Sequence, residues 1–221
     1  MDWQALKLSL QLAAVTLVVL LPPGLWLGRW LAYGRFAGKA AIEALVVLPL
    51  VLPPTVLGYY LLVSLGGASP LGGWLAEHLG VQLTFTFPGL VLASVIFNLP
   101  FIVQPVQRAF EAIPRQLGEA AAVSGLSAWQ TFWRVELPLA WPGVLSAMVL
   151  TFVHTMGEFG VVLMMGGSIP GETKTIAISI YDRVQGFDLA GADRMAALLL
   201  LLSLGAVAVS FFASARLAVR R

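Results

Sequence analysis

Between two strongly apolar segments the chain reads Glu119-Ala120-Ala121-Ala122-Val123-Ser124-Gly125, and nine residues later Val135-Glu136-Leu137-Pro138. The loop that holds both motifs also carries three arginines. Pro114 suits the first turn of a helix, and Gly125 can take the left-handed conformation that ends one. The pattern therefore predicts a short helix of small side chains, a turn and a second helix outside the bilayer.

The composition on both sides of this loop is that of a membrane protein. Hydrophobic residues make up 59% of the 221 residues and charged residues 11%, against about 25% charged residues in soluble domains. The net charge of +2 is too small to indicate nucleic-acid binding. The absence of cysteine excludes disulfides and thiolate metal sites, and the two histidines have no metal-ligand spacing.

Five segments are long enough to cross a bilayer as helices, which needs about 20 apolar residues. The expected spans are 8–28, 42–65, 88–107, 143–165 and 195–215, with a loop of about 108–142 between the third and fourth. The expected fold is therefore an all-α membrane protein. It is expected to be a single transmembrane domain, 1–221, formed by a polytopic bundle of about five helices with a helix-turn-helix loop. Between the last two spans, residues 175–181 are apolar but too short to cross, which predicts a short helix at the surface or dipping into the bundle.

The distribution of positive charge predicts the orientation. The links after the first and third spans and the C-terminal tail are basic, whereas the link after the second span has no lysine or arginine. Loops rich in lysine and arginine are cytoplasmic, so the N-terminus is expected outside and the C-terminus in the cytoplasm. The basic residues are Arg29, Arg35 and Lys39, then Arg108, Arg115 and Arg134, and finally Arg216, Arg220 and Arg221.

The second helix of the loop has an aromatic face. Ser127 and Gln130 fit a capping box at its start, and Trp129, Phe132 and Trp133 lie three and four residues apart. Pro138 is expected to limit its continuation. The aromatic face could rest on lipid headgroups or dock into a groove of a cytoplasmic partner.

The motif spacing resembles the coupling loop of permease subunits of binding-protein-dependent ABC importers. The stretch 48–60 resembles the second-span signature of molybdate permeases, and 157–160 followed by 166–173 resembles a signature shared by molybdate, tungstate and sulfate permeases. Small departures are Ser168 for a more usual Asn and Val135 for a more usual Ile. The resemblance implies a type I importer fold and a coupling role for Glu119, Ala120, Ala121, Gly125, Trp129, Trp133, Val135, Leu137 and Pro138.

The same resemblance implies the partners, which are a second copy of the chain, two ATP-binding cytoplasmic subunits and an extracytoplasmic oxyanion-binding protein, within a bacterial inner membrane and its lipid. The stretch from Gly34 to Ala40 lacks the glycine spacing and the Ser or Thr of a phosphate loop. We therefore expect no catalytic residue and no cofactor in this chain, with ATP and Mg²⁺ bound by a partner subunit.

Two ionisable residues fall inside the fourth expected span. His154 and Glu158 lie four residues apart, on one helical face, and can hydrogen-bond each other. Such residues indicate function by default. The pair could be a proton relay, could line a cation pore, or could be a structural pair; the last is favoured because an exposed carboxylate would repel an anionic cargo.

The candidates for the translocation path are small polar residues rather than carboxylates. They are Thr55, Ser94, Asn98, Thr151 and Thr155, although such residues in membrane helices often only bond to backbone carbonyls. Molybdate is the expected cargo, with tungstate or with sulfate or thiosulfate as alternatives. A stand-alone gradient-driven carrier or channel is the alternative from another class, and the inverted repeats that would support it were not found.

Overall fold

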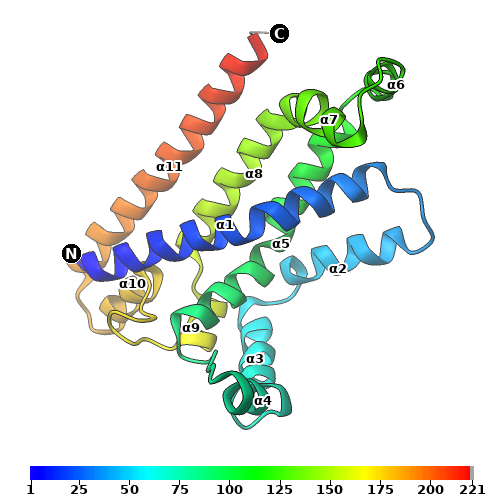
Figure 1. Ribbon diagram of the computed structural model, residues 1–221. Helices are drawn as coiled ribbons and strands as arrows, with labels where there is room; N and C mark the ends of the chain where they lie inside the picture. Colours follow the sequence, from blue (N-terminus) through cyan, green and yellow to red (C-terminus); the bar gives the residue numbers. More distant parts are fainter. Residues whose placement is uncertain (220–221) are drawn as a thin grey trace.

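The computed structural model describes the backbone of residues 1–219 and the side chains of residues 1–212, and its regular elements are all helices. Four long helices, α1 (Trp3–Tyr33), α5 (Phe87–Glu111), α8 (Leu137–Gly157) and α11 (Leu189–Val219), form the body (Figure 1). The all-α prediction is confirmed in this described part. Arg220 and Arg221, which contributed to the predicted orientation, lie outside it, as does the side chain of Arg216.

Glycines let α1 and α5 approach closely. A methyl group added at Gly24 would lie 2.7 Å from Cγ2 of Ile102, and one added at Gly28 would lie 2.6 Å from Cγ1 of Val106. Small residues at this spacing allow membrane helices to pack backbone against side chain. The two glycines of α1 therefore serve packing.

The second expected span, 42–65, is wrong as a single helix. The chain forms α2 (Lys39–Val51) and α3 (Pro54–Leu65), which are bent by 105° relative to each other. Leu52 and Pro53 have ψ angles of 137° and 132°, because a residue that precedes proline is driven out of the helical region. By length and composition the described residues thus contain four spans, or five if the bent pair is one.

The fourth expected span, 143–165, is also wrong in its bounds. A helical run begins at α7 (Ala128–Thr131), passes through the π-helical turn η1 (Phe132–Glu136) and continues as α8 to Gly157. The chain is extended at Glu158, with ψ 128°, and α9 (Gly160–Gly166) follows. The apolar pattern runs through this break because α9 is itself apolar.

Three short helices complete the chain. The expected helix around 175–181 is confirmed as α10 (Ile176–Gln185), which Thr175 caps by accepting from the Ile178 N–H. The helix α4 (Pro70–Leu79) was not expected, although Ser69 and Pro70 form a typical helix start. The polar helix α6 (Arg115–Val123) lies at the end of the molecule opposite the N-terminus (Figure 1).

Candidate functional site

The turn between α6 and α7 is built by two local devices. Gly125 has a φ of +80°, and the Leu126 N–H donates to the Ala121 carbonyl at 3.1 Å, which closes the end of α6. The Ser127 hydroxyl then accepts from the Gln130 N–H at 3.3 Å, while the Gln130 side chain accepts from the Ser127 N–H at 2.9 Å. The predicted capping box is confirmed.

The motif residues separate into an exposed group and a buried one. Trp129 and Trp133 are 69% and 50% exposed, with their rings in edge contact at 5.5 Å. Ala121 and Leu137 are buried, so their side chains are not part of the exposed surface of the loop. Val135 is half-buried, and the other exposed motif residues are Glu119, Ala120, Gly125 and Pro138.

Pro138 is expected to limit the second helix of the loop, but the helical run continues past it into α8. The wide π turn lets the Leu137 N–H donate to the Phe132 carbonyl, and Pro138 then occupies the first turn of α8. The aromatic face is consequently joined to a membrane helix without a flexible link.

An ion pair ties this loop to α1. Arg29 donates to both carboxylate oxygens of Glu136, from Nε at 2.5 Å and from Nη2 at 3.1 Å, and Glu136 is only 8% exposed. The Arg29 guanidinium also lies 5.6 Å from the Phe132 ring centre. Sequence reasoning missed this pair, because the two residues are 107 positions apart and only their opposite charges signal it.

A buried polar cluster lies between α5 and the break after α8. Glu158 accepts from the Ser94 hydroxyl at 3.1 Å and from the Asn98 amide at 3.4 Å. His154 bonds through Nδ1 to Asn98 Oδ1 at 3.0 Å and stacks on Phe101. The expected direct bond between His154 and Glu158 is therefore wrong, because Glu158 lies beyond the end of α8 and Asn98 connects the two.

The two helix breaks meet at a cavity of about 520 Å³. Pro54 and Thr55 line it from the start of α3, and Gly157, Glu158 and Gly160 line it from the second break. A methyl added at Gly160 would lie 2.8 Å from Cβ of Pro54, so the breaks are packed together. Glu158 also borders this space.

Of the five candidates for the path, only Thr55 is exposed and lines the cavity. Ser94, Asn98, Thr151 and Thr155 are buried within the protein. The Thr155 hydroxyl donates to the Thr151 carbonyl at 2.8 Å, which is the backbone bonding common in membrane helices. The break that carries Thr55 was not anticipated, so its position beside Glu158 could not be predicted.

A thiol at Thr55 is expected to report movement of this cavity. In the otherwise cysteine-free chain, Thr55→Cys should react with a water-soluble maleimide. In a complex with the ATP-binding subunits that the resemblance implies, ATP should change the rate several-fold. Thr155→Cys, which is buried, is the matched control and should stay slow in both conditions. Equal rates for Thr55→Cys with and without ATP would argue against a gated cavity here.

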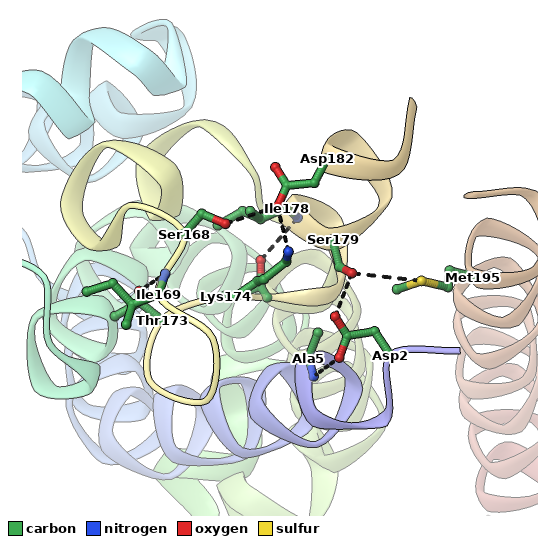
Figure 2. Close-up of polar contacts among 11 residues, drawn as sticks. Asp2, Ala5, Ser168, Ile169, Thr173, Lys174, Ile178, Ser179, Asp182 and Met195 are labelled. Carbon is green, nitrogen blue, oxygen red and sulfur yellow. Dashed lines mark hydrogen bonds and ion pairs between the residues drawn. The ribbon is translucent and has the colours of Figure 1, made fainter. Parts of the chain in front are cut away.

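Polar contacts join the N-terminus to α10 at the end of the molecule opposite α6 (Figure 1 and Figure 2). Asp2, before α1, accepts from the Ala5 N–H at 3.0 Å and from the Ser179 hydroxyl of α10 at 2.8 Å. Partial burial alone would raise the pKa of Asp2, but these hydrogen bonds and the charges of Lys174 and Arg183 outweigh it and hold that pKa below its usual value.

Lys174 adds a second contact at this end, with Asp182 at 2.6 Å, while the Ser168 hydroxyl donates to the same carboxylate at 3.1 Å (Figure 2). The segment before α10 is therefore fixed to that helix. The result is an ordered polar surface formed by α10 and the loop around it.

The sequence of the whole chain settles its family. Residues 24–221 match the family described as binding-protein-dependent transport system inner membrane component. The chain belongs to this family. It is thus an inner membrane component of a transport system, which agrees with its four or five candidate spans.

Relatives of the chain include proteins named as molybdenum permeases. The chain is 50% identical to the molybdenum transport system permease protein ModB of Azotobacter vinelandii, covering 91% of this chain and 89% of that one. It is 36% identical to ModB of Escherichia coli strain K12, with 98% and 93% covered. The sulfate transport system permease protein CysW of the same strain is more distant, at 34% identity with 90% and 68% covered.

The fold is also that of a solved importer. A bacterial ABC transporter involved in the import of alginate has a chain of similar structure, with a TM-score of 0.79. The match covers 96% of this chain and 78% of that one, at 19% sequence identity. The chain therefore shares its helical arrangement with a chain of that transporter.

Proposed function

We propose that this chain is the membrane permease subunit of an ATP-driven importer that carries molybdate into the cell. The single observation that carries the proposal is the 50% identity to a molybdenum permease over nine-tenths of both chains. The exposed helix α6 and the two exposed tryptophans that follow it supply a surface suited to a cytoplasmic ATPase.

The proposed complex has two copies of this chain, two ATPase subunits and an extracytoplasmic oxyanion-binding protein, in membrane lipid. ATP and Mg²⁺ would be bound by the ATPase subunits, with no cofactor in this chain. The polar surface around α10 lies away from α6 (Figure 1) and is the part proposed to receive the binding protein. Tungstate shares its charge and geometry with molybdate and is the first alternative cargo.

Uptake by the purified complex in liposomes tests the proposal. With ATP inside and no proton gradient, molybdate should accumulate when the binding protein is outside, and sulfate should compete weakly. Sulfate uptake at the same rate would contradict the assignment of molybdate as the cargo. Uptake that follows a proton gradient and ignores ATP would overturn the importer assignment in favour of a stand-alone carrier.

The proposed orientation has the N-terminus outside and the C-terminus in the cytoplasm, since the basic links are expected there. Reporter fusions after Lys39, Gly80, Pro138 and Asp188 should report inside, outside, inside and outside, respectively. The bent pair α2–α3 makes the fusion after Gly80 the critical one, because a re-entrant pair would return the chain to its starting side. A cytoplasmic report there would contradict five spans.

A further inference from the structure

A second cavity, of about 460 Å³, lies at the end of the molecule that carries α6. Three arginines line it: Arg29 from the last turns of α1, Arg35 from the following link, and Arg115 from the first turn of α6. Two glutamates, Glu119 and Glu136, complete the charged lining. The cavity is separate from the one formed at the two helix breaks.

The charges in this cavity do not cancel. Glu136 is held by Arg29 through both oxygens, so this pair is neutral and its arginine is fixed in position. Within the described side chains, neither Arg35 nor Arg115 has a carboxylate within 4.0 Å. Glu119 alone opposes these two exposed guanidinium groups, which leaves the pocket net positive.

The backbone adds to this positive charge. The first turn of α6 contributes Pro114, Arg115 and Gly118 to the lining, and no side chain caps that end of the helix. Uncapped N–H groups at a helix N-terminus favour anions, as does the positive end of the helix dipole. Three guanidinium groups and this helix end therefore surround one space.

We propose that this pocket binds a tetrahedral oxyanion. Arg35 and Arg115 provide the free guanidinium donors, and Arg29, fixed by Glu136, provides the remaining N–H groups. Guanidinium groups match the oxygen geometry of such anions. The volume of about 460 Å³ leaves room for a headgroup or for an ion with its waters.

Two sources could supply this chemistry. One is the phosphate of an anionic phospholipid: Trp26 and Trp30 are 67% and 37% exposed on the last turns of α1, and exposed tryptophans lie at headgroup level. Basic pockets between helices on the cytoplasmic side hold such headgroups. The other is a free oxyanion in the cytoplasm, which for this chain includes the proposed transported ion.

Binding to the purified full chain distinguishes the sources. One arm uses native mass spectrometry to compare how much phosphatidylglycerol and how much phosphatidylcholine stay bound to the chain. The other arm uses equilibrium dialysis to measure binding of radiolabelled inorganic phosphate. The variant is Arg35→Gln with Arg115→Gln, both at exposed positions where substitution costs little stability. Arg134→Gln, an exposed arginine of η1 outside the cavity, is the matched control.

We expect the double variant to bind one of the two probes at least about tenfold more weakly, because it lacks two charged donors. Arg134→Gln should bind both probes as the wild type does. Loss of phosphatidylglycerol alone assigns the pocket to a lipid headgroup, and loss of inorganic phosphate assigns it to a free oxyanion. If the wild type binds neither probe, or if the double variant keeps both unchanged, the pocket is not an oxyanion site.

Discussion

Replacing Gly125 with valine is expected to reduce molybdate uptake by about tenfold or more while the complex still assembles. Gly125 has a φ of +80°, a conformation that costs an ordinary residue about 1–2 kcal/mol and a β-branched one more. The turn sets the angle between α6 and the aromatic residues of α7. A shift there would move Ala120 and Trp129 relative to each other, and both are exposed parts of the proposed coupling surface.

The space around Gly125 makes this test specific to the backbone. A methyl group at this position would have no atom within 4 Å beyond its chain neighbours, so the Cβ itself meets no steric obstacle and the expected strain comes from the positive φ. Gly125→Asn is the matched control, because asparagine tolerates the left-handed region and should keep most of the uptake. Wild-type uptake by Gly125→Val would show that the turn has no role in coupling.

Replacing Glu158 with glutamine is expected to leave assembly intact and at least part of the ATP-driven uptake. Glutamine keeps a side-chain oxygen of similar size for the Ser94 hydroxyl and the Asn98 amide, which both donate to one oxygen of Glu158. A proton relay, by contrast, would need a group that changes protonation in each cycle. Uptake by the purified complex in liposomes, with ATP and without a proton gradient, is the measurement.

Glu158→Ala should be the more damaging substitution. It leaves the Ser94 hydroxyl without its acceptor, at a cost of about 1–3 kcal/mol for a buried donor, and it opens a gap at the second helix break. We expect a lower yield of folded complex and a lower Tm than for Glu158→Gln. Complete loss of uptake in a well-folded Glu158→Gln complex would show that the carboxyl group itself takes part in transport.

Local patterns in the sequence were enough to predict most of the helices. An apolar run in a bilayer must be helical because only a helix satisfies its own backbone groups, so α1, α5 and α11 follow from composition alone. The capping box at Ser127 was equally predictable, since its bonds join residues three positions apart. The short helix α10 followed from an apolar stretch too short to span.

The two helix breaks could be predicted only in part. The prolines at 53 and 54 signalled a disturbance, but membrane helices often tolerate proline as a kink, so a 105° bend was not indicated. The break at Glu158 has no proline at all. Each break leaves backbone groups outside a regular helix. Whether such a break is stable depends on the residues that pack against it, as Gly160 packs against Pro54.

Side-chain partners on helices distant in sequence were decided by tertiary structure alone. Sequence spacing placed His154 and Glu158 on one face, but it could not show that Asn98, from another helix, lies between them. It marked Ala121 as small, but not as buried. Local hydrogen bonding and the bilayer thus determined where helices form, whereas the packing of helices distant in sequence determined which residues face each other, as Arg29 faces Glu136 across 107 positions.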